Sequence, residues 1–155
     1  MNNSDIRPKK DMARVTTYQS GIAQASAHRV INRVVAEYLV RYDLTAMQWF
    51  IIGCIHDAGE SGISLGELRL IIGTTLPYMT NTINVLESKN FIQKKNHAKD
   101  ARIKVVTVLP QSIELVEEIE AGLRDELRDT LYSVDHITRD ELQTYITVLY
   151  KIINA

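Results

Sequence analysis

The sequence predicts a mainly α-helical chain with one small β-hairpin, and three observations lead to this fold class. Apolar residues recur at helical spacing over most of the 155 residues. Capping motifs mark the points where several helices begin. In residues 91–109 the period shortens and β-branched residues become frequent, which predicts two strands. The length suits one globular domain, and the single cysteine excludes an internal disulfide framework.

The first half of the chain is predicted to contain one long helix and three shorter ones. The apolar residues of segment 18–42 form one stripe at helical spacing, which predicts a long amphipathic helix. The capping boxes TAMQ at residues 45–48 and SLGE at residues 64–67 open the second and third helices. These boxes satisfy backbone N–H groups that a helix start leaves free.

The fourth predicted helix follows Gly73, with Thr74 or Thr75 as its cap and Pro77 in its first turn. Asn90 is the expected left-handed terminator. Helical spacing gives this helix an inward face formed by Met79, Ile83 and Leu86.

The second half is predicted to begin with the hairpin and to end with two helices. The strands are FIQKK (residues 91–95) and RIKVVTVL (residues 102–109), joined by the tip NHAKDA. Pro110 starts a long helix whose apolar stripe runs from Ile113 to Val134. A third capping box, TRDE at residues 138–141, opens the last helix.

These elements divide the chain into three parts. Residues 1–14 resemble a flexible arm, and residues 45–109 can close a small core of their own. The helical segments 15–44 and 110–155 carry apolar stripes that need partners, so we expect an interlaced homodimer. A monomeric helical domain is the competing interpretation.

Charge is segregated along the chain, although the net charge is only −1. Residues 110–155 contain four Lys/Arg against ten Asp/Glu. Segment 89–104 is basic, with Asp100 as its only acid. Clustered positive charge marks a candidate phosphate-facing surface even when the total is neutral. The basic residues of this segment are Lys89, Lys94, Lys95, Lys99, Arg102 and Lys104.

A helix-turn-helix followed by a basic hairpin is the winged-helix arrangement. A helix fits the major groove of DNA, where its side chains read base edges. A basic hairpin reaches the backbone or the adjacent minor groove. The helix starts capped by Ser64 and Thr75 present N–H groups that suit phosphates. The predicted fold is therefore a winged helix-turn-helix lobe joined to a helical dimerisation region.

The chain resembles the MarR family of transcriptional regulators over residues 18–155. The matching segments are LTAMQW, SLGEL, TTLPYMTNTINVLESKNFI, the D-x-R pattern of KDAR and the strand ending in VTVL. The resemblance implies a homodimer that reads a pseudo-palindromic double-stranded DNA site and represses transcription. It also implies that Arg102 is the wing arginine, that Asp100 supports it, and that Thr80 lies in the middle of the recognition helix.

The candidate DNA contacts fall on two elements. Those of the recognition helix are Thr74, Thr75, Pro77, Tyr78, Thr80, Asn81 and Thr82. Those of the wing are Lys94, Lys95, His97, Lys99, Asp100 and Arg102. Asn81 stands where the family often has Arg, and residues 74–88 contain no Lys or Arg. Because Asn pairs with adenine and Arg with guanine, we expect an A/T-rich operator, with thymine-methyl contacts from Tyr78 and Thr82.

The resemblance further implies a small anionic or phenolic effector, bound between the dimer helices and the winged lobe. Trp49 matches a position beside that crevice, and His28, Arg29 and His56 are candidate polar groups in it. The alternatives are that Trp49 anchors the core and that His28 and Arg29 lie on the outer side of their helix. Cys54, flanked by isoleucines, is expected to be a buried structural thiol.

Other function classes find less support in the sequence. It lacks a Gly-rich phosphate loop, a G-x-S-x-G elbow and an H-E-x-x-H pair, so no enzyme, cofactor or metal site is predicted. No apolar run approaches the roughly 20 residues that span a bilayer, so no membrane partner and a cytoplasmic location are expected. Two alternatives stay open: a dimer that uses its winged lobe as a protein adaptor, and a metal- or redox-responsive regulator.

Overall fold

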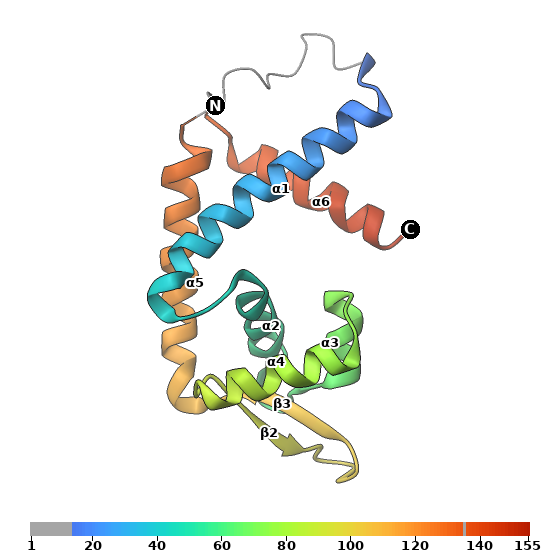
Figure 1. Ribbon diagram of the computed structural model, residues 1–155, viewed down its shortest axis with the longest axis vertical. Coiled ribbons are helices and arrows are strands. Elements are labelled where there is room, and N and C mark those ends of the chain that lie inside the picture. Colours follow the sequence, from blue (N-terminus) through green and yellow to red (C-terminus); the bar gives the residue numbers. More distant parts are fainter. Residues whose placement is uncertain (1–13, 135) are drawn as a thin grey trace.

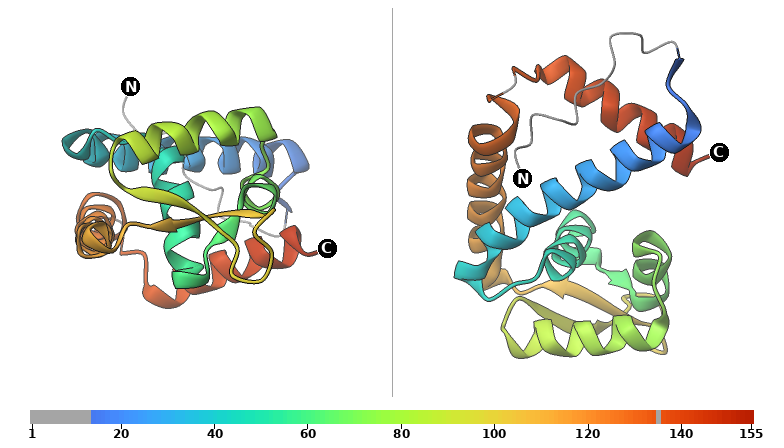
Figure 2. Two further views of the ribbon diagram at one scale, coloured as in Figure 1. Left: turned by 90° about the horizontal axis from the view of Figure 1, so that it is seen from below. Right: turned by 45° about the horizontal axis from the view of Figure 1, so that its top comes forward.

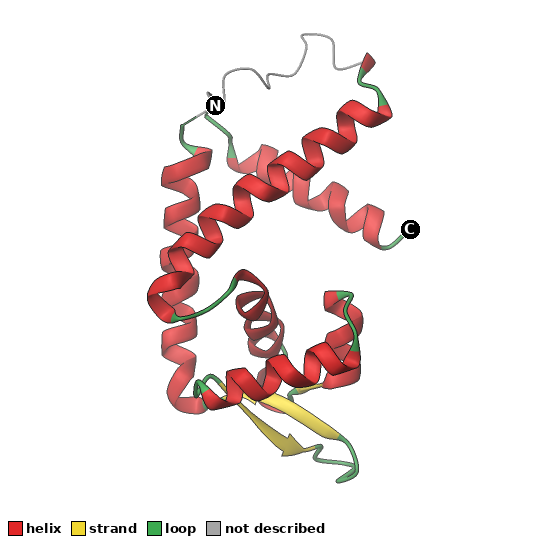
Figure 3. Ribbon diagram, in the orientation of Figure 1, coloured by secondary structure: helices red, strands yellow, loops and turns green. Residues whose placement is uncertain are grey.

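The computed structural model describes residues 14–134 and 136–155, so the predicted arm lies almost wholly outside the described part. Figure 1 shows a lobe at one end and the helices α1 and α6 at the other, with α5 running between the two ends along one side. The helices are α1 (Thr17–Leu39), α2 (Ala46–Asp57), α3 (Leu65–Ile72), α4 (Leu76–Ser88), α5 (Ile113–Leu127) and α6 (Arg139–Ile153). The strands are β1 (Ile63–Ser64), β2 (Ile92–Asn96) and β3 (Lys104–Val108). The mainly α-helical fold class with a small wing is confirmed (Figure 3).

The helix starts follow the capping motifs of the sequence. Thr45 Oγ1 accepts a hydrogen bond from the backbone N–H of Gln48 at 3.1 Å, and Gln48 Oε1 accepts one from the N–H of Thr45 at 3.1 Å. Equivalent boxes open α3 and α6. Thr75 rather than Thr74 caps α4, with Pro77 in its first turn. Asn90 ends that segment with a φ of 63°, as predicted.

The wing sheet contains a strand that periodicity did not predict. Within the described residues, the sheet has three antiparallel strands in the order β1-β3-β2. The two-residue β1 pairs Ile63 with Val106, which pairs with Lys94 on its other side. Gly62 leads into β1 with a φ of 74°, and a Cβ there would lie 2.8 Å from the Val106 carbonyl oxygen. Only glycine allows this backbone approach without a shift.

The core of the lobe lies between the helices and the sheet. The predicted inward face of α4 is confirmed, because Met79, Ile83 and Leu86 are fully buried. The same core cluster contains buried apolar residues of α2 and Val106 of β3. Figure 2 shows α4 on the outer side of the lobe beside the hairpin, and residues on its other face are exposed.

The long helix predicted from Pro110 begins later and changes form. Pro110–Ser112 makes a 3₁₀ turn, and α5 starts at Ile113. Its central stripe of Val116, Ile119 and Leu123 is buried. After Leu127 the chain widens into a π-helical turn, Arg128–Tyr132. Ile113 and Val134, at the two ends of the predicted stripe, are exposed in the single chain.

The end of α1 is fixed against α5. The Tyr38 side chain is buried, and a Cβ at Gly122 would lie 1.8 Å from its hydroxyl oxygen. The guanidinium carbon of Arg41 lies 4.2 Å from the centroid of the Tyr38 ring. Burial, followed by the neighbouring Tyr42, raises the pKa of the Tyr38 hydroxyl. Glycine at position 122 thus permits the close approach of the two helices.

The helix α6 lacks buried residues in the single chain, although its sequence is strongly amphipathic. Large apolar side chains on it remain exposed: Tyr145, Ile146, Val148, Tyr150, Ile152 and Ile153. The start of α1 adds the exposed side chains of Tyr18 and Ile22. In the described part of the chain, the helices are too short or too polar to cross a membrane.

Candidate nucleic-acid interface and adjoining groove

The outer face of α4 presents a mostly polar row to solvent. Tyr78 and Asn81 are exposed, as are Thr75 and Pro77 at the start of the helix. Thr74 and Thr80 are half-buried. A helix with a buried apolar face and an exposed polar face of this kind can enter the major groove of DNA.

Thr82 departs from the row that the sequence analysis assigned to DNA contact. It is buried, and its hydroxyl donates to the Tyr78 carbonyl at 3.0 Å. The reason is helical phase, since Thr82 lies three residues after Met79 and next to Ile83 on the inward face. A thymine-methyl contact from Thr82 is therefore not available in this structure.

At the wing tip, Asp100 and Arg102 form a closed ion pair. Asp100 Oδ1 accepts hydrogen bonds from the backbone N–H and from Nε of Arg102, both at 3.0 Å. Its Oδ2 accepts one from the guanidinium Nη2 at 3.1 Å. These bonds lower the pKa of Asp100 and raise that of Arg102. The Arg102 side chain is nevertheless 90% exposed, so the aspartate holds the arginine without hiding it.

Most wing lysines already have partners within the chain. Lys94 Nζ donates to the side-chain oxygen of Asn84 and lies 3.8 Å from a carboxylate oxygen of Glu87. Lys95 Nζ donates to the Glu60 carbonyl at 2.6 Å. The sequence analysis did not find these partners, because they belong to other elements, α4 and the turn Gly59–Ser61.

The tip carries the cation with the most freedom. Lys99 is exposed, and within the described residues its ammonium group has no partner. Its backbone N–H donates to His97 Nδ1 at 3.1 Å, which orders the turn around it. Lys99 and Arg102 are therefore the wing cations best placed to meet a phosphate.

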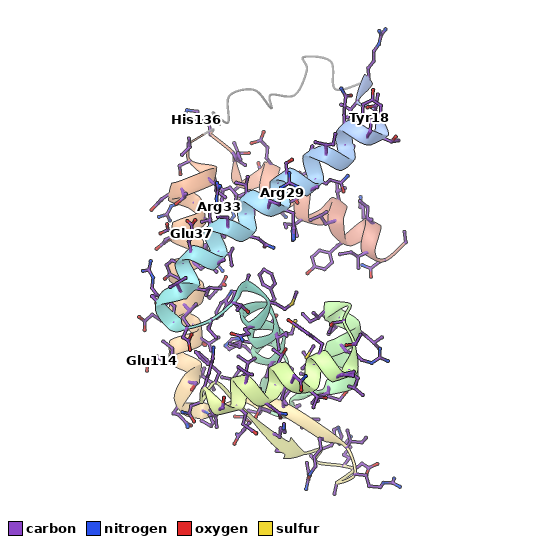
Figure 4. All side chains as sticks on the ribbon, in the orientation of Figure 1. Tyr18, Arg29, Arg33, Glu37, Glu114 and His136 are labelled. Atoms are coloured by element: carbon purple, nitrogen blue, oxygen red, sulfur yellow. The ribbon has the colours of Figure 1, made fainter. Side chains whose placement is uncertain are left out.

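A groove of about 660 Å³ lies between α2 and α5. Of the four candidates for an effector crevice, Trp49 and His56 line this groove, although Trp49 is also a core residue with 7% exposure. His28 and Arg29 do not line it. Both are exposed on α1, and Figure 4 shows Arg29 on the part of that helix near α6. The remaining lining residues are Phe50, Gly53, Cys54, Asp57, Val116, Glu117, Glu120, Ala121 and Arg124.

The polar groups of the groove gather around His56. Its Nδ1 lies 3.8 Å from Asp57 Oδ1, and its Nε2 lies 3.5 Å from Glu117 Oε1. Cys54 is half-buried rather than fully buried, and desolvation followed by the charge of Asp57 raises the pKa of its thiol. Such a thiol is a poor nucleophile at neutral pH. Within residues 14–134 and 136–155, the His, Cys, Asp and Glu side chains do not gather in a group that could hold a metal ion.

A family model and several solved structures match this arrangement. The fold is similar to that of the S. aureus MepR–DNA complex, with a TM-score of 0.68 and 23% identity over 91% of this chain and 98% of that one. It is similar to S. aureus MepR in its DNA-binding conformation, with a TM-score of 0.69 and 24% identity over 90% and 98% of the chains. It is also similar to the apo form of wild-type MarR from E. coli, with a TM-score of 0.65 and 24% identity over 85% and 94%. The model of the MarR family matches residues 44–104, the segment that runs from α2 through α4 and β2 to the first residue of β3. Residues 44–104 are therefore similar to the MarR family, and the solved structures share the fold of the described chain.

Proposed function

We propose that this chain is a homodimeric repressor that binds double-stranded DNA in a sequence-specific way and is released by a small molecule. The observation that carries the proposal is the exposed polar face of α4 beside Arg102, which Asp100 holds in a solvent-facing position. The polar side chains on this face of α4 can read bases, and Arg102 can enter the minor groove. The similarity to MepR bound to DNA supports the same use of the lobe.

The proposed dimer rests on α6 and on the start of α1. A 15-residue amphipathic helix without a buried side chain leaves its apolar surface in water, and association with a second copy removes that surface. In the proposed dimer, residues 15–44 and 110–155 associate with the same segments of a second copy, and residues 45–109 contact DNA. Two lobes related by a two-fold axis then read a pseudo-palindromic site.

The proposed operator is A/T-rich. The exposed reading face of α4 offers Asn81 and Tyr78, and neither Lys nor Arg occurs between residues 74 and 88. Asn suits adenine N6 and N7, whereas guanine is read most often by arginine. A site selected from random duplexes should therefore carry A·T pairs at the positions that α4 reaches, and invariant guanines there would contradict this.

DNA binding is tested with duplexes selected from a random-sequence pool. We expect salt-dependent binding, and we expect Arg102→Ala to weaken it by roughly 1–3 kcal/mol, as measured by fluorescence anisotropy. Arg128→Ala is the matched control, because Arg128 also pairs with aspartates but lies on the turn after α5. A protein that ignores DNA at low salt would overturn the proposal and favour the adaptor alternative.

The dimer is tested by light scattering. We expect a mass of twice 17.6 kDa for the unmodified chain. Ile146→Asp, on the exposed face of α6, should shift the protein to the monomer because it places a charge in the apolar interface. Ile71→Asp changes a similarly exposed isoleucine on α3 and should leave the dimer intact. A monomeric unmodified chain at micromolar concentration would contradict the proposed assembly.

A further inference from the structure

We propose that the groove between α2 and α5 binds an organic cation with an apolar or aromatic body. This assignment reverses the ligand charge that the family resemblance implied. It deepens the proposed function, since it names the chemical class of the small molecule. Only the effect of that molecule on DNA binding rests on the proposed function. The groove itself can be tested on the protein without DNA.

The apolar part of the groove can hold a hydrophobic ring system. Phe50 projects from α2 with 39% of its surface exposed, and Trp49 lies deeper with 7% exposed. Val116 and Ala121 of α5 form the opposite wall. Gly53 leaves the floor open, because nothing lies within 4 Å of the place where its Cβ would stand. Aromatic faces attract cations, and this attraction grows as water is excluded.

The charged part of the groove is acidic. Its carboxylates are Asp57 on α2 with Glu117 and Glu120 on α5, and its only permanent cation is Arg124. Arg124 is occupied by Glu120, since its Nη2 lies 3.0 Å from Glu120 Oε1. The three carboxylates therefore outnumber the one guanidinium, so an entering anion would meet a net negative charge.

Two carboxylates are left for a ligand. Among the described residues, the charged partner of Asp57 and of Glu117 is the ring of His56, at 3.8 and 3.5 Å, and the two side chains are 89% and 63% exposed. They stand on the two facing helices, so a cation between them would be attracted from both sides. Asp57 already acts on the thiol inside the groove, because its charge contributes to the raised pKa of Cys54.

The same residues argue against a bare metal ion as the occupant. A divalent cation needs several donors converging at short range, and no such group of His, Cys, Asp or Glu occurs in the part of the chain that the structure describes. An organic cation needs only an apolar wall and a negative field, and it is held without close coordination. The groove supplies both of these.

The sequence provides two reporters in this groove. Trp49 is the only tryptophan of the chain and Cys54 is its only cysteine, and both line the groove. Ligand binding can therefore be followed in the unmodified protein by Trp49 fluorescence. The rate at which the uncharged reagent iodoacetamide alkylates Cys54 gives an independent second signal.

The probes are tetraphenylphosphonium and tetraphenylborate, which have nearly the same shape and opposite charge. We expect the cation to change Trp49 fluorescence, to slow alkylation of Cys54, and to bind at least about tenfold more tightly than the anion at low salt. Equal affinities would show binding by apolar contact alone and would overturn the proposal, as would tighter binding of the anion.

Two variants locate the charge. Glu117→Gln, alone and combined with Asp57→Asn, should weaken binding of the cation by roughly threefold to tenfold and reduce its salt dependence. Glu114→Gln removes the same charge from the same helix but outside the groove, and it should bind the cation as the unmodified protein does. Unchanged affinity in the double variant would overturn the assignment.

The DNA affinity of the same preparations is measured separately. Loss of cation selectivity with intact DNA binding would refute only the further inference. Failure to bind DNA with intact cation selectivity would refute only the proposed regulator.

Discussion

At the scale of single residues, the wing shows that the positive charge a lysine offers to a ligand depends on whether its ammonium group already has a partner in the chain. Lys94 and Lys95 point their ammonium groups at oxygens of the chain, whereas Lys99 does not. A cation that already has a partner releases fewer counterions when it meets a phosphate. The number of basic residues in the segment therefore overstates the charge available to DNA.

This difference predicts unequal effects for two equal charge changes. Lys99→Ala should lower the slope of log affinity against log salt by about one, because one phosphate contact is lost. Lys94→Ala should change the slope less, since Asn84 and Glu87 hold that side chain. Titration of a labelled duplex over a series of salt concentrations measures both slopes, and equal losses would contradict the explanation.

A second residue-scale prediction concerns a buried hydroxyl. Among the buried side-chain polar atoms that the structure describes, Thr107 Oγ1 has no hydrogen-bond partner. Thr107→Val keeps the shape and removes this unsatisfied group, so it should raise the free energy of unfolding by about 1 kcal/mol. Thr82→Val is the matched control, because that hydroxyl does donate to a carbonyl, and it should lower the free energy by about 0.5–1 kcal/mol. Urea unfolding measures both; a loss in Thr107→Val would contradict the account.

At the scale of elements, the sequence predicted what is encoded locally. A capping box needs only residues i and i+3, so Thr45 with Gln48 and Ser64 with Glu67 could be recognised before any tertiary contact was known. β1 could not be recognised, because two residues carry no period and Ile63 finds its partner Val106 far along the chain.

The approach of β1 to β3 makes a prediction at position 62. Gly62→Ala should destabilise the lobe by more than about 1 kcal/mol, because the backbone has a positive φ and the new Cβ would meet the Val106 carbonyl oxygen. Gly53→Ala, in the interior of α2 with free space around it, should instead stabilise by roughly 0.5–1 kcal/mol. Thermal unfolding of the two variants should show shifts of opposite sign.

The candidate site follows the same division between local and remote information. The inward phase of Thr82 was already present in its spacing of three from Met79, but its polar type favoured an outward assignment. The carboxylates of the groove could not be found in this way. Asp57 and Glu117 lie 60 positions apart, and only the packing of α2 on α5 brings them to the same histidine.

At the scale of the whole molecule, a net charge of −1 is the sum of separated regions rather than an even mixture. The wing tip presents Lys99 and Arg102, while Glu117 and Glu120 of α5 face the groove. A molecule of this kind carries an electric dipole that orients it before contact, with its basic end toward a polyanion. Charge separation can therefore support DNA binding where the total charge does not.

The exposed helix α6 has a consequence for the stability of the proposed dimer. If its apolar face is covered only by a second copy, folding and association share one equilibrium, and the melting temperature should rise with protein concentration. Calorimetry over a hundredfold dilution series tests this, with Ile146→Asp expected to lose the concentration dependence. The amount of protein in a cell then decides how much of it is folded as well as how much operator is occupied. When a growing cell dilutes the protein, the folded fraction and the occupancy of the operator would fall together.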